Sequence, residues 1–245
     1  MVVGEPERGS STASPTNVAY RIDRLAHRIS GQWLDFGCAD GGYDEEILAR
    51  GAEQVYGVDV EEDRIASATL RALPNTRYFT FDGRTLPFPD EQFDGVFMNE
   101  VFEHVADEGR ALREARRVLK PGGCLALISP NRWFPFEGHG ARIFSRRIGY
   151  PTPLIPWLPT RVTRSWTNAR NYWPGELVRH VRSAGFTIEE LGFIWPVFES
   201  YPWLPPRALS YYQRHFRSWD DKPVIRRLGV STMVIGIKPH LMIPA

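Results

Sequence analysis

Short apolar runs and amphipathic stretches alternate along the first half of the chain. The apolar runs have the length of buried strands and are bounded by polar or turn-forming residues. They lie at residues 32–36, 54–59, 76–81, 93–98 and 124–129. Apolar residues recur with a helical period at residues 17–29, 43–50, 62–71 and 107–119, and LKPGG with Pro121 breaks the last of these helices. This alternation predicts a parallel sheet with helices on both faces, and a ligand site beyond the carboxyl ends of its strands.

The composition changes at Asn131. Seven of the eight tryptophans and fourteen of the twenty prolines lie from residue 130 onward. Residues 131–183 contain nine arginines but only two acids, Glu137 and Glu176. We therefore expect an insertion after the fifth strand, too rich in proline for regular helices.

The chain is expected to form one domain, residues 17–245, after a disordered segment of residues 1–16 that is polar and rich in Gly, Pro and Ser. Two insertions, which cover the acceptor, are predicted within this domain. The insertions are predicted at residues 131–173 and 196–222. A helix at residues 174–185 and a strand at residues 186–195 lie between them, and a last strand lies at residues 231–239. The sheet would then have seven strands.

The bulk composition narrows the class of protein. With 245 residues, 42% of them hydrophobic, the chain can bury an ordinary core, and its net charge of +1 argues against DNA and disfavours RNA as partners. Cys38 and Cys124 lie in apolar runs, which predicts reduced, buried thiols. The N-terminus lacks the apolar centre of a signal peptide, and no apolar run approaches the ~18 residues that span a bilayer. We expect a cytoplasmic protein.

Residues 34–42, LDFGCADGG, indicate a nucleoside-bearing cofactor. A strand carrying Asp35 leads into a loop of small residues, and Asp59 ends the next strand. Small residues allow close approach of the backbone, and an acid about 20 residues on can bind ribose hydroxyls. A dinucleotide is the rival ligand, but Asp35 would repel a pyrophosphate and suits a cationic group. If both aspartates only capped helices, their shared position at strand ends would be unexplained.

The order of the motifs resembles the class I S-adenosylmethionine (SAM)-dependent methyltransferases, especially the type 11 group. The matching pieces are LDFGCADGG, VYGVDV, FDGRTLPFPDEQFD, NEVFEHV and RRVLKPGGCLALISPN, within residues 32–131. The resemblance implies an α/β, Rossmann-like fold, with a mostly parallel seven-stranded sheet between two helical layers. It also implies SAM as the cofactor.

The resemblance assigns cofactor-binding roles residue by residue. The methionine part of SAM would be surrounded by Asp35, Gly37, Cys38, Ala39, Asp40 and Gly41. Asp59 would accept both ribose hydroxyls, and Val60 would pack on the adenine. The adenine edge and the sulfonium end would be contacted by Asp82, Gly83 and Asn99. Ala39 departs from the pattern, because the family has a glycine there.

The segment NEVFEHV contains the candidates for the methyl-transfer step. Glu100, Glu103 and His104 would share one face of a helical turn. In one interpretation they bind Mg²⁺ or Mn²⁺ with His139, since E-x-x-E-H resembles metal-dependent small-RNA 2′-O-methyltransferases and ubiquinone-pathway O-methyltransferases. In the other no metal binds, the glutamates are solvated, and His104 or His139 is the general base, or His104 merely packs.

The acceptor is inferred from the aromatic insertions. Aromatic side chains beside arginines suit a sugar, although any single one also fits core packing. The prediction is an O-methyltransferase that acts on a hydroxyl of a carbohydrate or glycoside, assisted by a divalent metal; WFPFEGHG resembles actinobacterial sugar O-methyltransferases. Three alternatives stay open: a lipid or polyprenyl-quinone acceptor, with IGYPTPLIPWLP on a membrane surface; RNA; and a non-catalytic SAM-binding partner protein. The insertions equally fit a homodimer interface.

Overall fold

A computed structural model describes residues 14–137, 141–143, 146–148, 152–163, 166–167, 169–196, 205–219 and 222–240. His139 and most of the predicted disordered segment 1–16 lie outside the described residues. The helix predicted at 17–29 is α1 (Pro15–Asp23), followed by a short 3-10 turn at Ala26–Arg28. Ser14 caps α1, because its side chain accepts a hydrogen bond from the Asn17 N–H.

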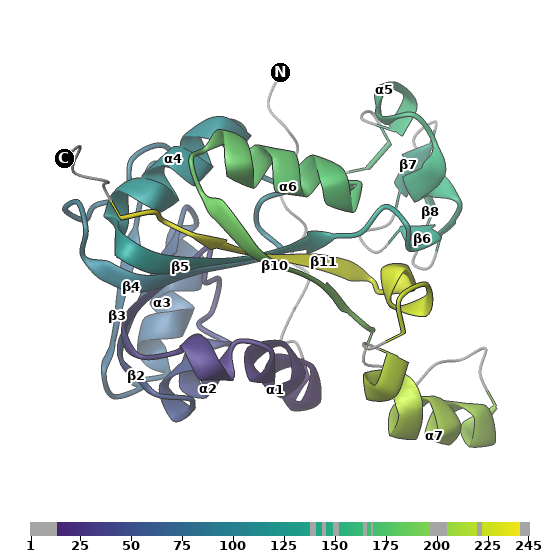
Figure 1. Cartoon of the computed structure of the whole chain (residues 1–245), viewed down its shortest axis with the longest axis horizontal. Coiled ribbons are helices and arrows are strands. Elements are labelled where there is room, and N and C mark those ends of the chain that lie inside the picture. The colour runs from purple at the N-terminus through teal and green to yellow at the C-terminus, as the bar shows by residue number, and fades with distance from the viewer. Residues whose placement is uncertain are drawn as a thin grey trace. The chain divides into compact units, whose positions relative to one another are not determined.

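Seven strands form one mixed, mostly parallel sheet (Figure 1). Their order across the sheet is β10-β11-β5-β4-β1-β2-β3, and β1 pairs in parallel with both β2 and β4. This confirms the predicted fold class. The strands are β1 (Gly31–Phe36), β2 (Ala52–Asp59), β3 (Thr76–Thr80), β4 (Phe93–Asn99), β5 (Leu119–Pro130), β10 (Thr187–Ile194) and β11 (Ser231–Ile237).

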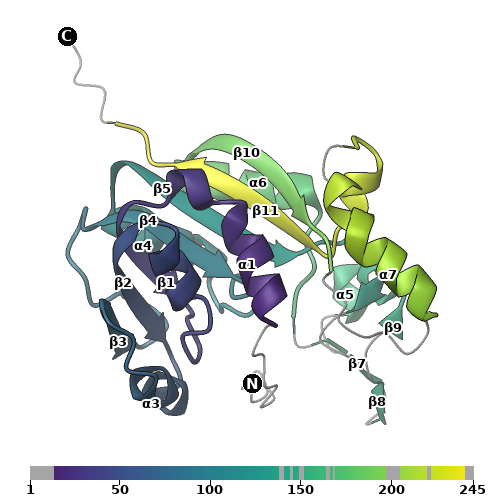
Figure 2. The same cartoon turned by 90° about the horizontal axis from the view of Figure 1, so that it is seen from below.

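Helices lie on both faces of the sheet, as Figures 1 and 2 show. On one face are α1, α2 (Asp44–Ala49) and α3 (Glu62–Leu70); on the other are α4 (Glu108–Val118) and α6 (Pro174–Ser183). The sequence of α4 explains its orientation. Ala111, Leu112, Ala115 and Val118 recur at helical spacing and are all buried, while its arginines lie between them.

Packing within the sheet fixes the register of β1 against β4. Trp33 of β1 is fully buried and pairs with Gly95 of β4. A Cβ atom at Gly95 would lie 2.3 Å from the Trp33 ring, so only glycine fits there. The two cysteines are free and buried, as predicted, and burial raises the pKa of Cys124 to about 12.

The helix predicted to end at LKPGG does end there, because α4 stops at Val118, but LKPGG itself belongs to a strand. Leu119 already pairs with Phe93, so β5 runs from Leu119 and contains Pro121 and both glycines. A register shift between Phe93 and Gly95 accommodates these residues, and Gly122 has a φ of 81°. The helix therefore passes directly into the strand, because the tertiary pairing overrides the local turn preference.

The chain separates into two compact units. Of the described residues, one unit contains those within 129–174 and 192–233, and the other contains those within 14–128, 175–191 and 234–240. Within the first, the Pro-rich stretch forms only short pieces, as expected, while the second insertion contains a full helix. These elements are β6 (Phe136–Glu137), β7 (Ala141–Ile143), β8 (Arg146–Ile148), β9 (Thr152–Pro153), α5 (Thr160–Thr163) and α7 (Pro206–His215), with 3-10 turns at Ile155–Trp157, Phe216–Trp219 and Ile225–Leu228. None of the described helices has the length and apolar content that crossing a bilayer requires.

Candidate active site

The small-residue loop between β1 and α2 is anchored to the neighbouring strand. The backbone N–H groups of Gly37 and Cys38 both donate to the Val58 carbonyl, at 2.7 and 2.9 Å. Gly37 has a φ of 80°, and a Cβ atom there would lie 2.4 Å from the Val101 side chain. Ala39 also has a positive φ, 49°, at the position where the family has glycine. Alanine therefore adopts the left-handed conformation here, at a cost of about 1 kcal/mol.

The Asp59 carboxylate holds this loop in place. It lies at the carboxyl end of β2 and is almost completely buried. One oxygen accepts the Ala39 N–H at 3.0 Å, and the other accepts the Glu61 N–H at 3.0 Å. Asp40 and Gly41 follow in the same turn, in which the Gly41 N–H donates to the Cys38 carbonyl. The loop and the end of β2 are thus joined through one carboxylate.

Asp35 lies beside a second acid, Asp44, which the sequence analysis did not identify as a site residue. Asp35 on β1 and Asp44 at the start of α2 are both buried and interact with each other, and burial also raises the pKa of Asp44. Burial raises the pKa of Asp35 well above its usual range, and the nearby carboxylates of Asp44 and Asp59 raise it further. The Tyr78 hydroxyl donates to Asp44 at 2.8 Å. An approaching cation would favour full ionisation of this pair.

Val60 and the segment after β3 meet beside Asp59. The Val60 side chain is 55% exposed, and a Cβ atom at Gly83 would lie 3.3 Å from it. Asp82 is exposed, and one of its oxygens accepts the N–H groups of Arg84 and Thr85, each at 2.8 Å. These two hydrogen bonds lower the pKa of Asp82. The exposed Val60 side chain next to the turn that Asp82 stabilises can pack against a flat ring whose edge carries polar groups.

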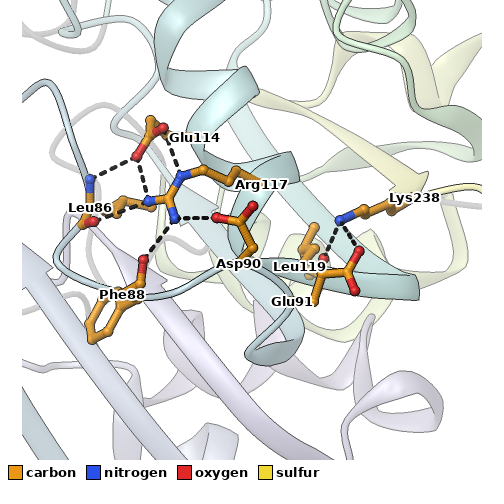
Figure 3. A network of polar contacts seen from close by, with 8 residues as sticks. All are labelled: Leu86, Phe88, Asp90, Glu91, Glu114, Arg117, Leu119 and Lys238. Atoms are coloured by element: carbon orange, nitrogen blue, oxygen red, sulfur yellow. Dashed lines mark hydrogen bonds and ion pairs between the residues drawn. The ribbon is translucent and has the colours of Figure 1, made fainter.

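Arg117 of α4 fastens the segment that follows Asp82 (Figure 3). Its guanidinium donates to the carbonyls of Leu86 and Phe88 and pairs with Asp90 at 2.9 Å. Glu114 completes the network, since it accepts both from Arg117 and from the Leu86 N–H. The turn that carries Asp82 therefore leads into a segment fixed to a helix of the core.

A buried arginine from α1 reaches the carboxyl end of β4. One nitrogen of Arg21 donates to the side chains of Asn99 and Glu100, at 2.5 and 2.9 Å. Burial alone would lower the pKa of Arg21, but Tyr43 and Glu100 outweigh it and raise the value. Glu100 has a φ of 55°, a strained conformation for a residue with a side chain. The predicted site residue Asn99 is thus fixed by a residue far away in the sequence.

The predicted metal ligands are arranged differently from the expected helical turn. Residues 101–104 form a non-helical turn, because the side chain of Asp107 caps α4, which begins only at Glu108. Glu103 is buried, whereas the His104 side chain is 42% exposed and its Nε2 lies 3.9 Å from a Glu103 oxygen. Within the described part of the chain, no three His, Cys, Asp or Glu side chains group as a metal site. The complete set with His139 lies partly outside the described residues.

Residues 34–127 match the family model described as a methyltransferase domain. Together with the strand order and the acid-bearing loop, this match places the chain among the class I SAM-dependent methyltransferases. The chain belongs to the type 11 family of these enzymes.

Two curated relatives illustrate the family. A probable SAM-dependent methyltransferase of Mycolicibacterium smegmatis is 31% identical over 168 residues, which is 68% of this chain and 56% of that protein. A ubiquinone biosynthesis O-methyltransferase of Nitrobacter winogradskyi is 35% identical over 171 residues, 67% of this chain and 60% of that protein. The chain thus spans less than two thirds of the length of these relatives.

Solved structures share the fold at low sequence identity. The methyltransferase partner of the Haloferax volcanii Trm112 activator superposes with a TM-score of 0.64 and 18% identity, over 92% of this chain and 91% of that one. A SAM-dependent methyltransferase from Aquifex aeolicus gives a TM-score of 0.61 and 16% identity, over 96% and 99%. Identities this low support the architecture alone.

Proposed function

We propose that the chain transfers a methyl group from SAM to a hydroxyl of a lipid-soluble aromatic acceptor of the polyprenyl-quinone type. The observation that carries this proposal is that four of the relatives, 31–35% identical, are named ubiquinone biosynthesis O-methyltransferases. The predicted carbohydrate acceptor has no such support among the named relatives. The lipid or quinone alternative of the sequence analysis therefore becomes the first choice.

In this proposal the residues at the carboxyl ends of β1, β2 and β4 bind SAM. Asp59 would accept the ribose hydroxyls through lone pairs that its two backbone hydrogen bonds leave available. Val60 would pack against the adenine, and Asp82 with Gly83 would contact the adenine edge. The buried pair of Asp35 and Asp44 would attract the α-ammonium group of the methionine part.

Methyl transfer to a phenol also requires removal of a proton with a pKa of about 10. His104 is the leading base among the described residues, since its ring is accessible and the buried Glu103 lies beside it. A negative neighbour stabilises the imidazolium that forms when the ring takes the proton. Glu100 is less suited to metal binding than the spacing indicated, because it already pairs with Arg21.

The acceptor class is tested with radiolabelled SAM. We expect the purified protein to label quinone-type phenols extracted into organic solvent, and to leave sugars and glycosides in the aqueous phase unlabelled. Heat-inactivated protein and reactions with the demethylated cofactor in excess serve as controls. Radiolabel found only in the sugar fraction would contradict the quinone-type acceptor and support the saccharide acceptor instead.

The base is tested with His104→Gln, which keeps the size and polarity of the side chain but removes its basicity. We expect kcat to fall about 100-fold, a typical contribution of a general base, while the Kd for SAM is unchanged. Excess EDTA is the second arm, and we expect the wild-type protein to retain full activity in it. Loss of activity that Mg²⁺ or Mn²⁺ restores would instead support the metal site of Glu100, Glu103, His104 and His139.

A saccharide remains the second candidate because of one described feature. Trp133 and Trp173 pack edge to face with ring centroids 5.2 Å apart, and both are more than one third exposed. The Arg132 guanidinium lies 5.2 Å from the Trp173 ring. Exposed aromatic rings beside a guanidinium are suited to stacking on a sugar ring.

A further inference from the structure

One segment of the chain exposes an unusual density of large apolar side chains. Leu154, Trp157, Leu158 and Val162 are 55, 48, 38 and 41% exposed, although they lie within nine residues of sequence. Ile155, in contrast, is buried beneath them. Single exposed apolar residues are common on protein surfaces, but a group of this kind marks an interaction surface. We call residues 152–163 the apolar platform.

The apolar platform is held rigidly by its own compact unit. The buried Arg132 donates to the backbone carbonyls of Pro156 and Leu158. The Leu154 N–H donates to the Pro135 carbonyl at 2.7 Å. Leu154 has a φ of 64°, a strained conformation for a residue with a side chain, which persists only where the surroundings impose it. The exposed side chains are therefore presented on a fixed backbone.

The unit that contains the apolar platform is strongly basic. Residues 129–174 and 192–233 hold thirteen arginines and lysines but only four acids, whereas the rest of the chain holds seventeen and twenty-five. Although the net charge of the whole chain is only +1, the positive charge is concentrated in this unit and the rest of the chain is acidic. Arg161 lies within the platform itself and is exposed.

We propose that the apolar platform docks this protein onto the surface of an anionic lipid bilayer. Tryptophan and aliphatic side chains enter the boundary between head groups and acyl chains, while the arginines of the unit attract anionic head groups. The same unit offers a second segment of this composition. In α7 no residue is buried, and Tyr211 is 57% exposed between Arg207 and Arg214.

Two other occupants fit the platform less well. A nucleic acid would use the arginines and the aromatic rings, but it gives no role to Leu154, Leu158 and Val162. A second copy of the chain would place two basic units against each other, and like charges across an interface cost several kcal/mol. The docking proposal deepens the proposed function, because a bilayer is where a lipid-soluble acceptor resides. It is nevertheless measured without SAM or acceptor, so either proposal can fail alone.

The test is co-sedimentation of the full chain with vesicles of phosphatidylcholine, alone or mixed with phosphatidylglycerol. We expect binding to the anionic vesicles only, with a blue shift of tryptophan emission. The double substitution Leu154→Ser and Leu158→Ser should lower the partition coefficient at least about tenfold, since about 0.8 kcal/mol is lost per buried methylene. The matched control is Leu70→Ser, which changes a leucine that is 85% exposed on α3 in the acidic remainder. It should leave binding unchanged.

Four results would overturn the docking proposal. They are absence of vesicle binding, equal binding to neutral vesicles, full binding by the double variant, and equal losses in the double variant and Leu70→Ser. Salt-dependent binding to a single-stranded RNA oligomer without vesicle binding would assign the basic unit to nucleic acid. A wild-type dimer that the double variant converts to monomers, again without vesicle binding, would assign the platform to self-association. An unchanged melting temperature in both variants verifies that the fold is intact.

Discussion

Replacement of Asp59 by alanine should weaken SAM binding at least about 100-fold, which corresponds to about 2.7 kcal/mol. The substitution would remove the carboxylate that accepts hydrogen bonds from the ribose hydroxyls. It would also leave the Ala39 N–H and the Glu61 N–H without the acceptor they have in the wild type. Hydrogen bonds to a charged group contribute about 1.5–3 kcal/mol each, so the loss of two kinds of contact accounts for this size. Isothermal titration calorimetry with SAM and with its demethylated product measures the effect.

The control for this experiment is Asp63→Ala, which removes an exposed acid from the first turn of α3. It should change the Kd for SAM by less than about twofold, because surface substitutions of this kind have small effects. Asp59→Asn keeps the shape of the side chain and guards against a folding defect. If Asp59→Asn folds with an unchanged melting temperature and binds SAM as the wild type does, the assignment of the ribose site to Asp59 is wrong.

The loop around Asp59 was predictable because its signals are local. The small residues 37–42 directly follow β1, which carries Asp35, and Asp59 ends the next strand, β2. Parallel strands bring their carboxyl ends to one edge of the sheet, so this short stretch of sequence contains both acids and the loop. The parallel sheet with helices on both of its faces was predicted from the same alternation of strands and helices. Ala39 adopts a left-handed backbone conformation in this loop although it is not a glycine.

Arg21 and Asp44 were not predictable, for two different reasons. Arg21 contacts Asn99 and Glu100 across 78 and 79 residues of sequence, and no local pattern encodes a contact of that range. Asp44 lies in the first turn of a helix, where an acid ordinarily faces solvent and complements the helix dipole. Here the turn faces Asp35 instead, and the carboxylate is fully buried.

The E-x-x-E-H segment lacks the helical turn that the sequence predicted, and its three side chains therefore lie differently from the expected arrangement. The spacing of Glu100, Glu103 and His104 places them on one face only if the turn is helical. Asp107 starts α4 later, and the positive φ of Glu100 turns its side chain toward Arg21. Glu103 then lies in the core, while His104 is left accessible. The cap at Asp107 and the strained backbone of Glu100 leave no trace in the hydrophobic period, yet they decide which of these side chains are buried and which are exposed.

Replacement of Arg21 by methionine should lower the free energy of unfolding by about 2–3 kcal/mol. Breaking a fully buried ion pair typically costs about 3–5 kcal/mol, and the partial exposure of Glu100, 26% of its side chain, reduces this value. Methionine retains the apolar packing of the arginine stem, so the loss reports the charge and its hydrogen bonds to Asn99 and Glu100. Urea denaturation monitored by tryptophan fluorescence measures it.

Arg24→Met is the matched control, because it lies one turn further along the chain and its pair with Glu190 is partly exposed, at 3.4 Å. We expect it to cost at most about 1 kcal/mol, as exposed ion pairs do. In the double variant Arg21→Met and Glu100→Gln, stability should partly recover, since no uncompensated charge is left at the end of β4. Equal losses for Arg21→Met and Arg24→Met, or additive losses in the double variant, would show that Arg21 does not hold this end of the sheet.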